Sequence, residues 1–233
     1  MSLSYELCYV AYVSGSGAWD NRLVNDSIIL RPLRRADYPA IAEILRRMWY
    51  AEPGLSPSCA RRLAMIDLHY SMLGSTSALL AQCDGKPVGI IATHVDVPGA
   101  RSRRRLFNWH RESILRLAAS LLPSAEGRDG LRKMLSLTHL DAKLLHGVQS
   151  KFDAEVVLFL VDESLRGCGI GRVLFDRAME EFRKAGVRRY FLFTDTRCDI
   201  GFYDHCGLSR LRGRRAALYG DAPETFYLYE GQA

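Results

Sequence analysis

Short apolar runs and helical stripes alternate along the chain, and one unit of this kind is clearer than the rest. Residues 156–161 form an apolar run rich in branched and aromatic side chains, as is typical of a strand buried on both faces. A glycine-rich turn follows. Residues 170–184 then place apolar side chains on one helical face and charged side chains on the other, and Gly186 can end this helix. The pattern predicts a strand, a glycine-rich loop and a helix in direct succession.

The pattern before this unit predicts a strand, two helices and a β-hairpin. Residues 27–32 contain the apolar run of the strand, and the two helices span about 37–49 and 58–74. The aspartate that opens the first helical segment can cap it. Two further strands, 78–83 and 87–95, are separated by an Asp-Gly pair, which is a strong hairpin signal.

The connection at residues 98–150 is much longer than usual between neighbouring strands. It carries two helical stripes, within 106–121 and 131–145, separated by residues 123–130. We expect a two-helix insertion between the third and fourth strands, because the segment is too short for a core of its own. Downstream of the central unit, the pattern predicts a strand within 187–194, a short helix at 199–205, and strands at 208–212 and 225–229.

Length and composition bound the class of protein. At 233 residues, the chain can bury a sizeable core, and we expect one domain at 27–233 after an N-terminal extension at 1–26. No apolar run reaches the ~18 residues of a membrane span, and Glu6 interrupts the apolar start, so a cytoplasmic protein is expected. The six cysteines include no C-x-x-C pair, and we predict neither a metal site nor a disulfide framework.

The net charge of +6 is unevenly distributed. One arginine block contains Arg101, Arg103, Arg104 and Arg105, and another contains Arg210, Arg212, Arg214 and Arg215. Such blocks can meet nucleic acid, an acidic membrane surface or an anionic ligand. Solvated surface is the commoner explanation.

The glycine-rich loop, Arg166-Gly167-Cys168-Gly169-Ile170-Gly171, has a physical use. Glycines let a backbone turn tightly and approach a ligand, and the first turn of a helix offers unpaired N–H groups to an anion. The loop should therefore hold phosphates. It is not a P-loop, since no Gly-Lys-Ser/Thr follows, and it departs from the dinucleotide spacing. The alternative is a tight strand-to-helix connection without a ligand.

The spacing Arg166-x-x-Gly169-x-Gly171 after a buried strand resembles the R/Q-x-x-G-x-G/A motif of the GNAT superfamily of N-acetyltransferases. The resemblance implies an α/β (α+β) fold, with a twisted mixed sheet of about six to seven strands flanked by helices, and acetyl-CoA as cosubstrate. Glu163 stands where many members have proline. The residues then expected to contact the coenzyme are Leu160, Val161, Asp162, Arg166, Gly167, Cys168, Gly169, Ile170, Gly171, Arg172 and Thr196. The backbone of the first three would serve the thioester and the pantetheine arm, and the loop amides the pyrophosphate.

Acetyl transfer to an amine requires an acid for the leaving thiolate. Phe202-Tyr203-x-x-x-Gly207-Leu208 resembles the F/L-Y-x-x-x-G-F segment of the same family, which implies that the Tyr203 hydroxyl lies near the coenzyme sulfur and acts as the acid. A phenol with a pKa near 10 stays protonated at pH 7. The alternative is a half-buried aromatic side chain on an amphipathic helix. Thr196 stands where many members have a coenzyme-contacting asparagine.

The transfer also requires a base, because a lysine-like amine with a pKa of about 10.4 is almost wholly protonated at pH 7. Glu155, at the start of the buried strand, matches a catalytic glutamate in part of the family, and partial burial would make it a better base. Asp153 and a water chain are the alternatives.

The resemblance thus implies an N-acetyltransferase that works by direct attack in a ternary complex on the amine of a small molecule or peptide. The acceptor stays open, as do a homodimer and the role of the insertion, which either walls the acceptor site or only packs. The alternative function is a regulatory protein on this fold that binds acyl-CoA or nucleic acid without catalysis.

Overall fold

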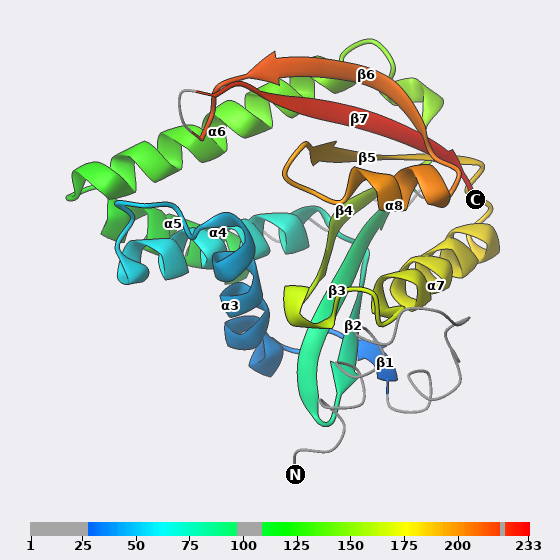
Figure 1. Ribbon diagram of the computed structural model, residues 1–233, viewed down its shortest axis with the longest axis horizontal. Coiled ribbons are helices and arrows are strands. Elements are labelled where there is room, and N and C mark those ends of the chain that lie inside the picture. The colour runs from blue at the N-terminus through cyan, green and yellow to red at the C-terminus, as the bar shows by residue number, and fades with distance from the viewer. Residues whose placement is uncertain (1–27, 97–108, 220–221) are drawn as a thin grey trace, which may run out of the picture.

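The computed structural model describes residues 28–96, 109–219 and 222–233, and a seven-stranded sheet runs through its centre (Figure 1). The order of the strands is β1-β2-β3-β4-β5-β7-β6. Only β4 and β5 pair in parallel, and the other neighbours are antiparallel. The strands are β1 (Ile28–Pro32), β2 (Ser77–Cys83), β3 (Lys86–Val95), β4 (Ala154–Val161), β5 (Arg189–Asp195), β6 (Ser209–Ala216) and β7 (Glu224–Gln232). The predicted mixed sheet of six to seven strands is confirmed. The predicted extension 1–26 and the block Arg101–Arg105 lie outside the described residues.

Helices cover both faces of this sheet (Figure 1). One face carries α3 (Tyr38–Trp49), α4 (Pro57–Gly74), α5 (Trp109–Leu121) and α6 (Ala125–Leu145), and the other carries α7 (Ile170–Lys184) and α8 (Ile200–His205). Short 3-10 turns are η1 (Arg35–Asp37), η2 (Gln149–Lys151) and η3 (Glu163–Leu165). Side chains of α7 and α8 form one core with β4 and β5, α3 and α4 form a second core with β2 to β4, and α6 packs on β5 and β7. The predicted hairpin is present as β2 and β3.

The insertion contains two helices, as predicted, but the predicted break at 123–130 is wrong over most of its length. Helix α6 begins at Ala125, where the Ser124 hydroxyl accepts a hydrogen bond from the Gly127 N–H. A Cβ on Gly127 would lie 2.2 Å from the Leu121 carbonyl oxygen, and one on Gly130 would lie 2.5 Å from the Leu63 side chain. These two glycines therefore lie inside α6 and let it pack closely against the end of α5 and against α4. They do not end a helix.

A β-bulge in β4 determines which side chains face which helices. Ala92 pairs with Leu158 and Thr93 with Val156, so one residue of β4 is left over between them. Before the bulge, Val156 packs in the core under α7. After it, Leu158 packs in the core under α3 and α4. Because side chains alternate along a strand, Glu155 lies on the same face as Leu158, toward α3, α4 and α6.

Two histidines pack at the junction of α4 and α5. His69 is buried, and its Nδ1 lies 3.1 Å from the Nδ1 of His110. The ring of Trp109 lies edge-on to His69, with 4.7 Å between ring centroids. Burial, with the neighbouring His110 and Arg116, lowers the pKa of His69 to about 4. The folded protein therefore holds this imidazole neutral.

We expect this histidine to make the fold acid-labile. Below pH 6.5 the unfolded chain protonates at this position while the folded chain does not, so stability is lost as the pH falls from 6.5 toward 4. The loss between pH 7.5 and pH 5 that stems from His69 should be about 2 kcal/mol. Denaturant unfolding at both pH values measures this. The free energy of unfolding that His69→Gln loses between them should be smaller than that of the unchanged protein by this amount. An equal loss in the variant and the unchanged protein would contradict the assignment.

Candidate active site

Strands β4 and β5 part after three residues. Their parallel pairing joins Ala154 to Tyr190, Glu155 to Phe191 and Val156 to Leu192, although each strand runs on beyond this point. The two strands diverge in Figure 1. The second half of β4 therefore has a strand partner on one edge only, the edge of β3.

The backbone of this second half determines which donors face the opening. The N–H of Asp162 donates to the carbonyl oxygen of Val88 at 2.8 Å, so this amide, part of the backbone predicted to serve the coenzyme, is already engaged within the sheet. Because backbone groups alternate along a strand, those of Leu160 also point toward β3, where Ile90 is its partner. The groups of Phe159 and Val161 point to the opposite edge, where β5 has parted.

The loop between β4 and α7 presents several unpaired N–H groups. Two other N–H groups of the loop are paired: Arg166 donates to the carbonyl oxygen of Glu163, and Cys168 to that of Leu165. These two amides, which were predicted to bind the pyrophosphate, are therefore engaged within the loop. Among the described residues, no acceptor is found for the N–H groups of Gly167, Gly169, Ile170, Gly171 and Arg172. They belong to the loop and the first turn of a 15-residue helix, which is a favourable arrangement for an anion.

The backbone conformation of the loop requires two of its glycines. Gly167 has φ = +81° and Gly169, the N-cap of α7, has φ = +79°, a region that other residues enter at a cost. Arg166 is exposed beside them, with no ion-pair partner among the described side chains. Arg172 instead lies on the helix surface, paired with Asp176 at 2.8 Å.

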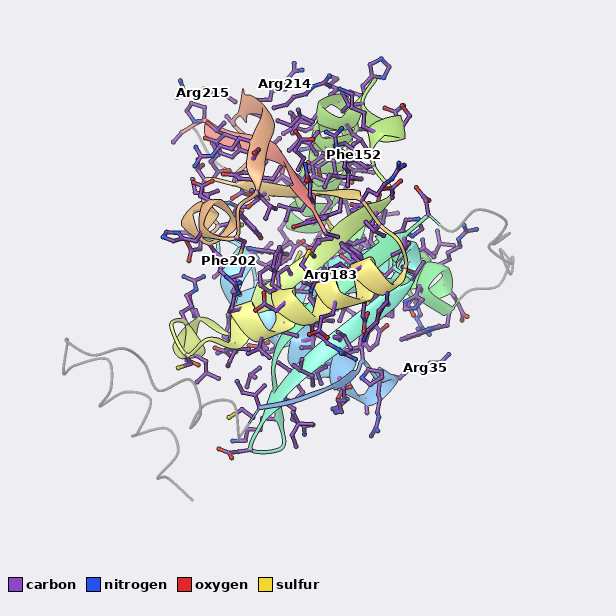
Figure 2. All side chains as sticks on the ribbon, turned by 90° about the vertical axis from the view of Figure 1, so that its right-hand side faces the viewer. Arg35, Phe152, Arg183, Phe202, Arg214 and Arg215 are labelled. Carbon is purple, nitrogen blue, oxygen red and sulfur yellow. The ribbon has the colours of Figure 1, made fainter. Side chains whose placement is uncertain are left out.

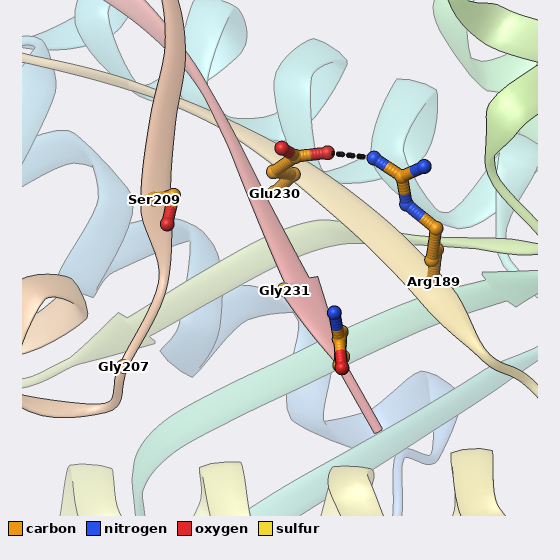
Figure 3. A pocket seen from close by; sticks show the side chains of 6 residues that line it. Arg189, Gly207, Ser209, Glu230 and Gly231 are labelled. Atoms are coloured by element: carbon orange, nitrogen blue, oxygen red, sulfur yellow. Dashed lines mark hydrogen bonds and ion pairs between the residues drawn. The ribbon is translucent and has the colours of Figure 1, made fainter.

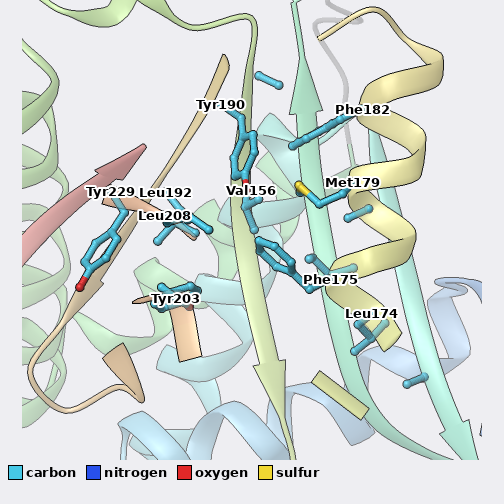
Figure 4. Close-up of a cluster of buried hydrophobic side chains, with 14 of the residues drawn as sticks. Val156, Leu174, Phe175, Met179, Phe182, Tyr190, Leu192, Tyr203, Leu208 and Tyr229 are labelled. Atoms are coloured by element: carbon cyan, nitrogen blue, oxygen red, sulfur yellow. The ribbon is translucent and has the colours of Figure 1, made fainter. Parts of the chain in front are cut away.

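Tyr203 lies on α8, whose N-terminus is capped by the carboxylate of Asp199. The side chain is 8% exposed, and its ring centroid lies 6.4 Å from that of Phe159 and 5.7 Å from that of Tyr229. Figure 4 shows it in the core under α7, below Leu208. Burial raises the pKa of the Tyr203 phenol far above its usual range, so the phenol is protonated at neutral pH.

The loop, the free half of β4 and α8 meet at Gly171. A Cβ on this residue would lie 3.5 Å from the Phe159 ring, 3.6 Å from the Phe202 ring and 3.8 Å from Val161. The first turn of α7 thus contacts both the half of β4 that no longer pairs with β5 and the helix that carries Tyr203.

Glu155 and Asp153, the two carboxylates considered as the base, have different surroundings. Glu155 is half-buried, and burial raises its pKa to about 7, with a further increase from Asp96 and an opposing effect of His94. Asp153 accepts hydrogen bonds from the N–H groups of Arg188 and Arg189 at 2.9 and 3.2 Å. These bonds hold the pKa of Asp153 below its usual range, which makes it a structural group and a poor base.

The structure adds a carboxylate that the sequence did not single out. Asp141, on the inserted helix α6, makes no hydrogen bond or ion pair with a described residue. Burial, together with Glu155 and Asp195, raises its pKa to about 7. Asp195 itself is buried at the end of β5 and accepts a hydrogen bond from the N–H of Arg197 at 2.8 Å. The insertion therefore brings a carboxylate without a cation next to Glu155.

A second group of polar side chains lies beside this one. The Tyr50 hydroxyl donates to Asp67 at 2.9 Å, and burial raises the pKa of Asp67 to about 6. The guanidinium of Arg197 stacks on the ring of Tyr219 at 3.5 Å, and the Asp67 carboxylate lies close enough to act electrostatically on Tyr219. Side chains from α3, α4 and the β6–β7 connection thus come together on the face of the sheet that carries Glu155.

Thr196, the other predicted coenzyme contact, is tied to β7. Its N–H donates to the Thr225 carbonyl oxygen at 3.1 Å, and its hydroxyl oxygen accepts from the Thr225 N–H at 3.3 Å. The threonine oxygen is thus already used within the sheet.

A pocket at the other end of β5 has a different character. Arg189, Ser209 and Glu230 line it together with Gly207, Gly231 and Gln232 (Figure 3). Arg189 and Glu230 form an ion pair within it. It lies near the first residue of β5, whereas the parting of β4 and β5 lies toward the last, so we do not assign the chemistry to it.

Within the described part of the chain, none of the helices combines the length and apolarity that crossing a membrane would require. In the same residues, no group of three or more His, Cys, Asp or Glu side chains is arranged to hold a metal ion.

Comparisons with known proteins agree on one family. The profile of the acetyltransferase (GNAT) family matches residues 38–208. The ribosomal-protein-S18-alanine N-acetyltransferase from Escherichia coli has a similar structure, with a TM-score of 0.52 at 15% identity, covering 88% of this chain and 93% of that one. The polyamine N-acetyltransferase of Drosophila melanogaster, which forms N-acetylagmatine, gives 0.52 at 11% identity, covering 88% and 100%. The protein yncA from Salmonella typhimurium, solved with its cofactor acetyl-CoA, gives 0.50 at 14% identity, covering 88% and 94%. A comparison with curated proteins finds no match.

Proposed function

This chain belongs to the GNAT family of acetyltransferases, and on that premise we propose that it transfers an acetyl group from acetyl-CoA directly to the amine of a small cationic molecule. It is an acyltransferase, and acetyl-CoA is its cosubstrate. The observation that carries the finer proposal is the parting of β4 and β5 after Val156. The unpaired loop amides and Tyr203 lie on one face of the sheet at this point, and Glu155 lies on the other.

The loop residues fit the diphosphate of the coenzyme. The unpaired N–H groups of Gly167 and of residues 169–172 would bind its oxygens, and the exposed Arg166 would add a positive charge. The free backbone groups of Phe159 and Val161 would hold the pantetheine arm. The bound coenzyme supplies the acetyl thioester, and its sulfur would lie near the Tyr203 phenol.

Glu155 and Tyr203 would share the proton transfers. At pH 7 only roughly one lysine-like amine in a few thousand is neutral, so the Glu155 carboxylate would take a proton from the acceptor ammonium. The pKa of Glu155, raised to about 7 by burial, suits this step. Tyr203 would give its proton to the sulfur as the carbon–sulfur bond breaks. Acid and base thus approach the reacting atoms from opposite faces of the sheet.

Charge on the acceptor side favours a molecule that carries more than one positive charge. Asp141 and Glu155 form no ion pair with a lysine or arginine in the described structure, and burial, together with Glu155 and Asp195, raises the pKa of Asp141 to about 7. A bound cation would relieve the repulsion among these carboxylates. We therefore propose a small diamine or guanidino amine as acceptor. The Drosophila melanogaster polyamine N-acetyltransferase acts on such a molecule.

Asp141→Asn should weaken the binding of dicationic acceptors selectively. The neutral amide keeps the shape but removes the charge, so KM for agmatine should rise by about tenfold, while KM for a monoamine changes by less than about twofold. Thiol release with both acceptors measures this. Asp129→Asn is the matched control, because Asp129 lies on the same helix but its side chain is half exposed and is paired with Arg132. Equal KM changes for both acceptors in Asp141→Asn would show that Asp141 does not recognise a second charge.

The proposed function is tested by thiol release from acetyl-CoA over a panel of amines. Diamines and guanidino amines should support turnover, and neutral or acidic amines should support little. If no amine on the panel releases thiol while acetyl-CoA still binds, the non-catalytic alternative replaces the proposal.

A nucleic-acid role has less support, because Arg210 and Arg212 are engaged with Asp204 and with the C-terminus of α6. Arg214 and Arg215 remain at the outer edge of the sheet (Figure 2), where basic side chains commonly protect an edge strand.

A further inference from the structure

Thr194 is a buried polar residue that the chemistry above does not use. It lies on β5, two residues past the last pair with β4, and is 8% exposed. Its hydroxyl oxygen is buried and has no hydrogen-bond partner among the described residues. Buried polar groups are nearly always paired, and an exception in a folded protein calls for an explanation.

Two side chains face this hydroxyl. Thr194 lies on the same face of β5 as Leu192, which packs in one core with Tyr203. Its side chain acts on the Tyr203 phenol and on the Cys198 thiol. A threonine hydroxyl has one donor and two acceptor lone pairs. The threonine oxygen can accept a hydrogen bond from the weakly donating Cys198 thiol. The threonine O–H is then left to donate to the oxygen of the phenol.

We propose that Thr194 is a positioning residue, whose hydroxyl donates a hydrogen bond to the oxygen of Tyr203 during acetyl transfer. This role rests on the proposed function, because it acts through Tyr203. A donor on the phenol oxygen turns the phenol proton away from Thr194 and toward the opening between β4 and β5. The same bond strengthens as negative charge develops on that oxygen, so it stabilises the transition state more than the ground state.

The proton balance of the step is simple. The carbon–sulfur bond breaks, the Tyr203 O–H bond breaks, and its proton forms the S–H bond of coenzyme A. The electron pair of the O–H bond stays on the phenolate, which accepts the hydrogen bond from Thr194. The attacking nitrogen, which has formed the carbon–nitrogen bond, gives its remaining surplus proton to solvent water. The phenolate regains a proton from solvent water when the product leaves, so the protons balance. Without the Thr194 hydroxyl, this phenolate would form in a buried site and would lack that hydrogen bond.

The variants Thr194→Val and Thr194→Ser separate this role from packing. Valine keeps the branched shape without the hydroxyl, and serine keeps the hydroxyl without the methyl group. We expect kcat to fall about tenfold in Thr194→Val, with KM for acetyl-CoA unchanged, since one hydrogen bond to a developing charge is lost. Thr194→Ser should stay within about twofold of the unchanged protein. If Thr194→Val does not fold, Thr194→Ala supplies a second variant without a hydroxyl.

The same change in the Tyr203→Phe background gives the decisive readout. If Thr194 acts through the phenol, Thr194→Val should cause no further loss there, whereas an independent or structural effect would add in full. The proposal is overturned if Thr194→Val has the kcat of the unchanged protein, or if its loss persists undiminished in Tyr203→Phe. Absence of turnover in the unchanged protein would instead overturn the proposed function, and this role with it.

Discussion

Replacing Tyr203 by phenylalanine is expected to lower kcat by about 100-fold and to leave the affinity for acetyl-CoA within about twofold. A positioned acid contributes about 10²–10⁴-fold to a proton-transfer step. We place the effect at the lower end because a thiolate, with a thiol pKa near 8.5, is already a fair leaving group. The phenylalanine ring keeps the contacts with Phe159 and Tyr229, so the coenzyme site should persist. Thiol release and calorimetry together measure both quantities.

Tyr227→Phe serves as the control for this variant. Tyr227 lies on β7 next to Tyr229 and packs against the same core, but no role is assigned to its hydroxyl. Turnover by Tyr203→Phe that matches this control would remove Tyr203 from the role of acid.

Glu155→Gln is expected to have the second-largest effect, a fall in kcat/KM of about 100-fold at pH 8. A base works when ionised, so the activity of the unchanged protein should fall as the pH drops below about 7, the pKa to which burial raises Glu155. The variant should lack this acidic limb. A pH profile of kcat/KM for both proteins measures it, and an unchanged acidic limb in Glu155→Gln would assign the base to another group.

The same variant should be more stable than the unchanged protein at pH 8. A carboxyl whose pKa is raised on folding adds stability below its unfolded pKa, and that contribution is lost as the pH rises through the folded value. Removing the half-buried charge should therefore stabilise the fold at pH 8 by about 1–2 kcal/mol. Loss of activity with a gain in stability would separate catalysis from folding.

Local patterns in the sequence were enough to predict most elements and the loop. The hairpin, the strand–loop–helix unit and the short helix capped by Asp199 each depend on residues that are neighbours along the chain. The glycines at 167 and 169 were noticed for the same reason, and the structure gives both a positive φ. The break predicted at 123–130 contains Gly127 and Gly130, and a glycine that ends a helix looks the same in a sequence as one that permits close packing.

Features that depend on pairing between distant strands could not be predicted. The bulge between Val156 and Leu158 puts Leu158 on the same face of the sheet as Glu155, the face that carries α3 and α4, and it is visible only in the register with β3. The Asp162 amide was expected to be free, but its acceptor, Val88, lies far away along the chain. Asp141 was missed because nothing in a helical stripe indicates which distant carboxylate it will face.

In the proposed function, loop amides between Gly167 and Arg172 bind the diphosphate of acetyl-CoA, and calorimetric titration of Gly169→Ala with the coenzyme examines this contact. An alanine at φ = +79° costs about 1–2 kcal/mol in local strain and should displace the loop. Gly186→Ala is the matched control, because Gly186 follows the other end of α7 with φ = +74°. We predict that the unchanged protein and Gly186→Ala bind acetyl-CoA equally, and that Gly169→Ala binds it at least about tenfold more weakly. No heat of binding to the unchanged protein at millimolar coenzyme, or equal affinity in all three proteins, would contradict the account.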